Sequence, residues 1–146
     1  MLTRKLVGLV ALLVASLSGN AAELKSVRVF KSPMCGCCGQ YVEYLKENGL
    51  KVAVVNTLDT RSIHAKYAVP DQLQSCHTAL VNGYVVEGHV PIGAIKKLVN
   101  EGRKIKGISL PGMPAGSPGM GQVTPGTLAV FEIPLGDEKP KVFSVE

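Results

Sequence analysis

The chain has 146 residues, a net charge of +5, four cysteines and no tryptophan, a length that suits one compact domain. The scattered basic residues have few aromatic neighbours, which argues against nucleic-acid binding. The sequence contains no evident paired catalytic carboxylates, Ser-His-Asp set or phosphate-binding glycine motif, so hydrolase and nucleotide-binding functions are not indicated.

The first residues have the layout of a bacterial signal peptide. Arg4 and Lys5 precede an apolar run over residues 6–17, and small residues follow up to Ala22. The run is shorter than the about 20 apolar residues of a spanning helix, so export is predicted rather than anchoring. We therefore expect residues 1–21 to be a cleaved signal peptide and the mature protein to be periplasmic, without membrane contact.

Three cysteines follow the first predicted strand. Residues 27–30 alternate in hydrophobicity and lead into a loop with Cys35, Cys37 and Cys38. Apolar residues then recur at helical spacing from about Cys38 to Asn48, where Asn-Gly predicts a helix end. The cysteines are therefore expected on a strand-to-helix turn.

The next segment is predicted to be a strand and a short helix. Residues 52–58 are nearly all apolar, which indicates a strand buried on both faces. Asp59 is placed to cap a helix that ends near Tyr67, and His64 on this helix is expected at the surface. A loop follows and ends at Cys76, the fourth cysteine.

A hairpin and an amphipathic helix complete the predicted core. Residues 78–81 and 84–87 flank Asn82-Gly83, a pair that favours a two-residue hairpin turn. Residues 92–102 have the apolar spacing of a helix. The order of strands and helices predicts an α/β fold, with a thioredoxin-like mixed sheet and flanking helices.

The tail has two parts. Residues 107–126 are rich in glycine and proline and are not expected to form regular structure. They are either a linker or an ordered loop folded over the cysteines. Residues 128–133 and 141–145 predict a C-terminal β-hairpin. We expect residues 22–106 to form the metal-binding core, with 107–146 packed on the same domain.

The cysteine cluster indicates a bound soft metal, a redox dithiol or structural disulfides. Thiolates favour Cu(I), zinc and iron-sulfur clusters, but structural zinc and iron-sulfur sites usually space their cysteines differently. Adjacent Cys37 and Cys38 cannot easily direct both sulfurs at one tetrahedral ion, yet they can bridge neighbouring Cu(I) ions. A polynuclear Cu(I) site fits best, and a binding protein is favoured over a turnover enzyme.

Cys76 is predicted to meet the other three cysteines. If residues 78–81 match the thioredoxin strand that follows a cis-proline, His77 stands near that proline and Cys76 faces the helix N-terminus. The helix dipole lowers thiol pKa values, so thiolates are expected at neutral pH.

Several residues have two interpretations. His77, Met34, Met113 and Met120 are candidate additional ligands, but the histidine can equally be hydrogen-bonded and the methionines can equally be packing residues. His89 is expected to cap or hydrogen-bond the loop near the site, with metal binding as the less favoured alternative.

The alternative function is thiol-disulfide exchange. Cys35 and Cys38 have Cys-x-x-Cys spacing, as in a thioredoxin-like oxidoreductase. The extra Cys37 would compete for the disulfide, and His77 occupies the place expected of the cis-proline. Both features make exchange the second choice.

The cysteine cluster, Ser75-Cys76-His77-Thr78, the segment 86–91 and the Pro-Gly-Met loop together resemble the CopG-type periplasmic copper-resistance family, formerly a domain of unknown function. The resemblance covers nearly the whole mature chain. It implies a thioredoxin-like fold, a polynuclear copper-thiolate cluster and a role in interconverting Cu(I) and Cu(II), which would make a copper-dependent oxidoreductase. The implied ligands are Cys35, Cys37, Cys38 and Cys76, and the implied partners are copper ions and other periplasmic copper-handling proteins.

Overall fold

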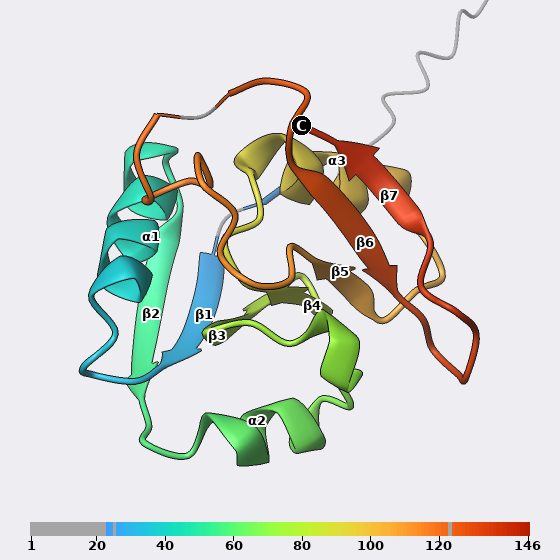
Figure 1. Cartoon of the computed structure of the whole chain (residues 1–146), viewed down its shortest axis with the longest axis horizontal. Helices are drawn as coiled ribbons and strands as arrows, with labels where there is room; N and C mark the ends of the chain where they lie inside the picture. Colours follow the sequence, from blue (N-terminus) through green and yellow to red (C-terminus); the bar gives the residue numbers. More distant parts are fainter. Residues whose placement is uncertain (1–22, 25, 123) are drawn as a thin grey trace, which may run out of the picture.

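The computed structural model describes residues 23–24, 26–122 and 124–146, so the predicted signal peptide lies outside the described residues. In chain order the elements are β1 (Ser26–Lys31), α1 (Gly36–Glu47), β2 (Lys51–Asn56), α2 (Thr60–Lys66), η1 (Asp71–Leu73), β3 (His77–Val81), β4 (Tyr84–Glu87), α3 (Ile92–Glu101), β5 (Gly107–Ser109), β6 (Ala129–Ile133) and β7 (Val142–Val145) (Figure 1). Across this described part, every helix is too short or too polar to cross a membrane.

The described strands form one mixed sheet. Its order is β2-β1-β3-β4-β5-β6-β7. β1 runs parallel to β2 and antiparallel to β3, and β4 runs antiparallel to β3 and parallel to β5. The predicted parallel pair and hairpin are therefore confirmed, and the C-terminal hairpin β6-β7 extends the sheet beyond β5.

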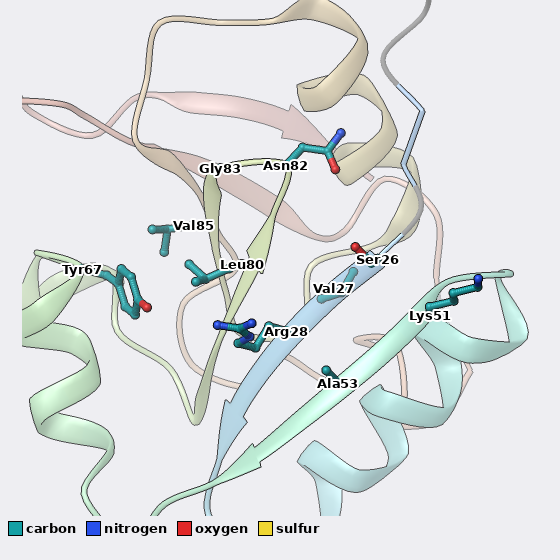
Figure 2. Close-up of a pocket in the computed structure, with 10 residues that line it drawn as sticks. All are labelled: Ser26, Val27, Arg28, Lys51, Ala53, Tyr67, Leu80, Asn82, Gly83 and Val85. Atoms are coloured by element: carbon teal, nitrogen blue, oxygen red, sulfur yellow. The ribbon is translucent and has the colours of Figure 1, made fainter.

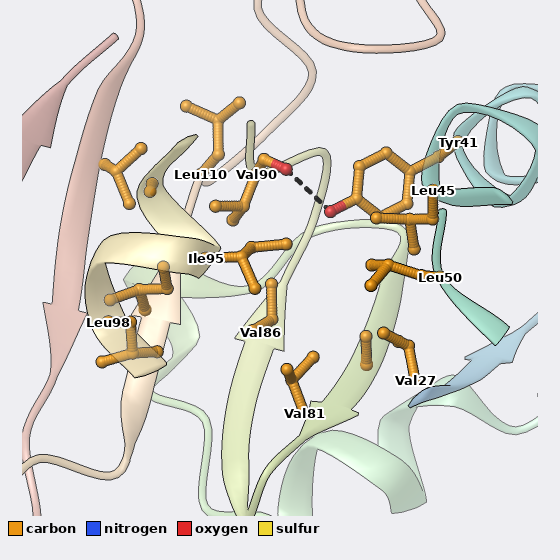
Figure 3. Close-up of a cluster of buried hydrophobic side chains, with 14 of the residues drawn as sticks. Val27, Tyr41, Leu45, Leu50, Val81, Val86, Val90, Ile95, Leu98 and Leu110 are labelled. Carbon is orange, nitrogen blue, oxygen red and sulfur yellow. Dashed lines mark hydrogen bonds between the residues drawn. The ribbon is translucent and has the colours of Figure 1, made fainter. Parts of the chain in front are cut away.

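The main core lies between the sheet and two helices. α1 and α3 pack on one face, against alternate side chains of the central strands. Figure 3 shows Tyr41 and Leu45 of α1 beside this cluster, with the Tyr41 hydroxyl donating to the Val90 carbonyl oxygen at 2.8 Å. The other face carries a smaller cluster around Val85 and Ile133. Such alternation follows from the two-residue period of a strand.

Local sequence signals set the ends of several elements. Asn82 and Gly83 both have positive φ, as the predicted two-residue turn requires. The Asp59 side chain caps α2 by accepting a hydrogen bond from the Ser62 backbone N–H at 3.0 Å. α3 ends at Gly102 in the left-handed conformation. These boundaries agree with the sequence predictions.

The prediction that the second strand is buried on both faces was wrong. β2 is at the edge of the sheet and pairs with β1. Its residues are mostly exposed, including Val54 and Val55 at 42% and 39%. An apolar sequence does not report strand order, and an edge strand receives less cover than a central one.

Three further predictions need correction. α1 begins at Gly36, not near Cys38, so Cys37 and Cys38 lie in its first turn. Gly107–Ser109 forms β5 within the segment expected to be irregular. His64 is buried at 6% exposure, not at the surface, because its ring faces the carboxylate of Glu87.

Candidate metal centre

Three of the site's sulfurs come from the start of α1. Cys35 is the N-cap residue, and its sulfur accepts a hydrogen bond from the Cys38 backbone N–H at 3.3 Å. The Sγ atoms of Cys35 and Cys37 are 3.4 Å apart. Cys38 is fully buried while Cys35 and Cys37 are partly exposed. The turn therefore presents one interior sulfur and two nearer to solvent.

Cys76 supplies the fourth sulfur from the segment that enters β3. Its backbone carbonyl oxygen lies 3.7 Å from the Cys38 sulfur. The Sγ atoms of Cys35, Cys37, Cys38 and Cys76 all lie within 4.8 Å of one another. The tertiary structure thus brings all four predicted ligand residues together. It does so because β1 and β3 are neighbours, with Lys31 opposite His77.

The structure holds two of these sulfurs in an oxidised form. Cys35 and Cys38 form a disulfide, whereas Cys37 and Cys76 are free thiols. These are the two residues that the sequence assigns to the redox alternative. Because thiolate is the form that binds metal, this pair becomes available as ligands only after a two-electron reduction.

His89 meets Cys76 from the short connection between β4 and α3. Its Nδ1 lies 2.8 Å from the Pro118 carbonyl oxygen, and its Nε2 lies 3.4 Å from the Cys76 sulfur. A carbonyl can only accept, so Nδ1 carries the proton and the Nε2 lone pair faces the sulfur. Burial lowers the pKa of His89, which favours this neutral form. Neutral imidazole is the ligand form of histidine.

His77 lies next to the same sulfur and is fully buried. Its Nδ1 is 3.4 Å from the Cys76 sulfur, and its ring is tilted against the Tyr41 ring with the two centroids 4.7 Å apart. Its Nε2 has no hydrogen-bond partner among the described residues. A buried polar atom ordinarily has a partner, so this nitrogen is an exception. The ring nitrogen that faces the cysteines is Nδ1, which is therefore the candidate ligand atom of His77. Cys76, His77 and His89 form a second group with donor atoms within 4.8 Å.

The expectation that every thiol is ionised at neutral pH was wrong for Cys76. Burial, followed by the charge of nearby Cys37, raises the pKa of Cys76 to about 11. Cys76 is not part of α1. It immediately precedes β3 and faces the helix from there. Its thiol is therefore protonated at neutral pH, and a metal must displace that proton to bind.

The candidate methionines differ in position. The Met113 sulfur lies 3.5 Å from the Cys37 sulfur. Met34 is 87% exposed, and its backbone N–H bonds to Ser32. Met120 is half-buried in a turn, where its backbone N–H donates to the Ser117 carbonyl. Met113 is thus the candidate that the described structure brings against a cysteine.

The glycine- and proline-rich segment lies over the site. Figure 1 shows it in orange, passing α1 on its way to β6. The Ser75 hydroxyl donates to the Gly112 carbonyl at 2.6 Å, and the Pro118 carbonyl accepts the hydrogen bond from His89 Nδ1. Gly119 packs so closely that an added Cβ would lie 2.8 Å from the Tyr41 backbone nitrogen. These contacts are those of an ordered loop.

A pocket of about 480 Å³ lies away from the cysteines. Arg28, Leu80 and Tyr67 line it, together with the Asn82-Gly83 turn (Figure 2). These side chains belong to the face of the sheet opposite the main core and to the opposite end of β3 from Cys76. Neither a cysteine nor a histidine lines the pocket, which is therefore separate from the metal centre.

Sequence reasoning underestimated the polar residues behind the cluster. His89 was expected to hydrogen-bond the loop, which it does, and its less favoured metal role gains weight from its contact with the Cys76 sulfur. Glu87 was not singled out from the sequence, and its partner His64 was placed at the surface. A charged residue at the end of an otherwise apolar strand was the available signal, since buried carboxylates need partners.

The neutral state of His77 gives a prediction about acid stability. Burial, then His89 and Lys31, lowers the pKa of His77 to about 3, whereas the unfolded chain has its ordinary value near 6.5. Between these values only the unfolded chain binds the proton. The contribution of neutral His77 to the free energy of unfolding is therefore fully present above the pKa of the unfolded chain, and at pH 5 it is lower by about 2 kcal/mol.

Urea unfolding of the metal-free, reduced protein at pH 7 and pH 5 measures this effect. His77→Phe keeps a ring against Tyr41 but cannot titrate, so its stability should fall less across the same interval. The nearby shifts of His89 and Glu87 are present in both proteins and cancel in the comparison. Equal losses in the two proteins would contradict the prediction.

Fold and site together define a class: a mixed α/β protein with a sulfur-rich centre at a helix N-terminus. Residues 73–120 match a family model described as "Protein of unknown function, DUF411", and no curated protein matches the chain. Two solved structures are similar, Form 1 and Form 2 of "Copper resistance protein copG". Form 1 is 33% identical, with 85% of this chain and 98% of that chain covered and a TM-score of 0.74. Form 2 is 32% identical, with coverage of 85% and 99% and a TM-score of 0.75.

The chain therefore belongs to the CopG family of copper resistance proteins. This confirms the family resemblance seen in the sequence and the predicted mixed α/β fold class.

Proposed function

We propose that this protein binds copper, and that in its reduced state it holds several Cu(I) ions as a polynuclear thiolate cluster on Cys35, Cys37, Cys38 and Cys76. Copper is the cargo, and the role is copper homeostasis and resistance. The observation that carries the proposal is the meeting of four sulfurs from two segments within 4.8 Å. Membership of a family whose solved members are titled copper resistance proteins supports it.

The donor set suits Cu(I) better than a hard cation. Thiolates are soft ligands, and imidazole and thioether donors also suit copper. The neutral Nε2 of His89 and the Nδ1 of His77 lie against the Cys76 sulfur, and the Met113 sulfur lies against the Cys37 sulfur. Adjacent Cys37 and Cys38 are suited to bridging neighbouring ions rather than chelating one.

Binding requires changes in the protein's own groups. An external dithiol reduces the Cys35–Cys38 disulfide: the dithiol gives up two electrons and two protons and becomes a disulfide, and the chain gains two thiols, which ionise when copper replaces their protons. The Cys76 thiol also gives up its proton. We further propose that the site interconverts Cu(I) and Cu(II), as the family resemblance implies, with the Cys35–Cys38 pair as the electron partner: two Cu(II) ions become Cu(I) as two thiolates join in the disulfide, and the reverse step returns the two electrons.

The proposed location is the periplasm, after export and removal of residues 1–21. The positive start and the short apolar run of the chain support this location. The periplasm oxidises unprotected thiols, so bound copper would keep the cluster reduced. Other periplasmic copper-handling proteins are the proposed exchange partners.

An anaerobic titration tests the proposal. The reduced protein is titrated with Cu(I) against a competing chelator, beside a control with all four cysteines changed to serine. We expect the wild type to take up more than one Cu(I) per chain. The control should take up none, as judged by the absence of Cu(I)–thiolate absorption. Excess Zn²⁺ should not displace the bound Cu(I).

Thiol-disulfide exchange is the second candidate because Cys35 and Cys38 form a disulfide in the structure. The same preparation is therefore assayed for dithiol-dependent reduction of a disulfide substrate. Turnover of that substrate without copper uptake would overturn the copper proposal and favour the oxidoreductase.

A further inference from the structure

A buried carboxylate lies directly behind the proposed copper site. Glu87, at the end of β4, is fully buried. Its Oε1 accepts hydrogen bonds from the Ser75 backbone N–H at 2.8 Å and faces His64 Nε2 at 3.0 Å. Its Oε2 accepts from the Thr78 hydroxyl at 2.6 Å. A buried charge is costly without such partners, so the surrounding segments are held around this group.

Two of these partners lie on either side of the Cys76-His77 pair. Ser75 precedes Cys76, and Thr78 follows His77. One carboxylate therefore fixes both ends of the short segment that delivers the fourth sulfur. The pairing of Thr78 with Glu87 in the β3-β4 register places the carboxylate opposite this segment.

The approach of these segments depends on Gly88. Its φ is +75°, and its backbone N–H donates to the His77 carbonyl at 3.0 Å. A Cβ at this position would collide with the Leu110 carbonyl oxygen and lie 2.8 Å from the Ser75 side chain. The chain therefore turns tightly beside Glu87 and keeps Ser75 within reach of the carboxylate.

Ser75 extends the same network to the loop over the site. Its hydroxyl donates to the Gly112 carbonyl at 2.6 Å, and the next residue, Met113, contacts the Cys37 sulfur. Ser75 is thus linked to Cys76 through the chain and to the Met113 loop through its hydroxyl. Movement of Ser75 would displace both.

We propose that Glu87 is a positioning residue for the copper site, which holds Cys76 and, through Ser75, the Met113 loop in the geometry that binds copper. This inference rests on the proposed function. Glu87 does not touch the metal in this role. It acts through the Ser75 N–H and the Thr78 hydroxyl, and His64 completes its hydrogen bonding from α2.

Glu87→Ala and Glu87→Gln separate positioning from charge. The alanine variant leaves the buried Ser75 N–H without its acceptor, and we expect its Cu(I) affinity to fall about 10- to 100-fold, as for second-layer partners of other metal ligands. The glutamine oxygen can still accept from Ser75 and His64, while the Thr78 hydroxyl reverses to accept from the amide. Glutamine should therefore recover most of the affinity.

A double-mutant cycle shows whether Glu87 acts through Cys76. In a Cys76→Ser background the ligand is already lost, so adding Glu87→Ala should weaken Cu(I) binding by less than about threefold. Coupled residues depart from additivity in this way, whereas independent ones do not. An equal fold-loss from Glu87→Ala in both backgrounds would overturn the proposal.

Thr78→Val repeats the cycle if Glu87→Ala does not fold. It removes a single hydrogen bond to Glu87 and keeps the side-chain shape. Thr127→Val in the tail is the matched control and should leave Cu(I) affinity unchanged. If Thr78→Val and any folded Glu87→Ala variant bind Cu(I) as tightly as the wild type, the positioning role of Glu87 is refuted, while the proposed copper-binding function stands. A wild type that binds no Cu(I) would instead refute the proposed function.

Discussion

Oxidised protein, with Cys35 and Cys38 joined, is expected to bind Cu(I) at least about 100-fold more weakly than reduced protein and to bind fewer ions. The disulfide removes two of the four sulfurs, because the sulfurs of a disulfide carry no thiolate charge to donate. Cys37 and Cys76 remain as thiols but cannot form the same bridged cluster. Parallel chelator-competition titrations of both forms, after counting free thiols, measure the difference.

A Cys35→Ser/Cys38→Ser double variant is the control for oxidation. It cannot form the disulfide, so oxidising and reducing treatments should give it the same weak copper binding. Equal stoichiometry and affinity in oxidised and reduced wild type would show that neither Cys35 nor Cys38 is a ligand. The proposed four-sulfur site would then be wrong.

Cys76→Ser is expected to lower Cu(I) affinity by more than about 100-fold and to reduce the number of ions bound. This exceeds the usual effect of second-layer residues because a ligand is lost. Cys76 is the sulfur contributed from outside the α1 turn, and it also contacts His77 and His89. Its loss therefore separates both imidazoles from the three remaining sulfurs.

Cys37→Ser is the matched comparison for this prediction. It also removes one sulfur, but this sulfur is on the exposed side of the cluster next to Met113. A smaller loss of affinity is expected, since Cys38 stays fully buried and Cys76 keeps its contacts with His77 and His89. Cys76→Ser with unchanged stoichiometry and affinity would remove Cys76 from the site even if copper still binds.

The cysteine cluster illustrates how far local sequence signals extend. The Asn82-Gly83 turn, the Asp59 cap and the apolar spacing of α3 were predicted correctly because each depends on a few neighbouring residues. The same holds for the placement of the three cysteines where β1 leads into α1, with Cys35 as the N-cap residue and Cys37 and Cys38 in the first turn of the helix. The start of α1 was misjudged by two residues, since a cysteine N-cap carries no strong sequence signal.

Errors arose where the outcome depends on distant segments. β2 has an apolar sequence but lies at the edge of the sheet. His64 is a polar residue but is buried against Glu87. Cys76 was expected to be ionised, yet burial raises its pKa to about 11. In each case the surroundings come from strand order and packing, which no short pattern specifies.

The sequence by itself determined the soft donor set, the local elements and the family resemblance, because residue chemistry and short-range spacing suffice for these. Only the tertiary structure decided that Cys76 joins the α1 cysteines, since the pairing of β1 with β3 brings together residues about 40 positions apart. It also decided that Glu87 lies behind Cys76. A buried carboxylate acquires its partners only when separate segments pack around it.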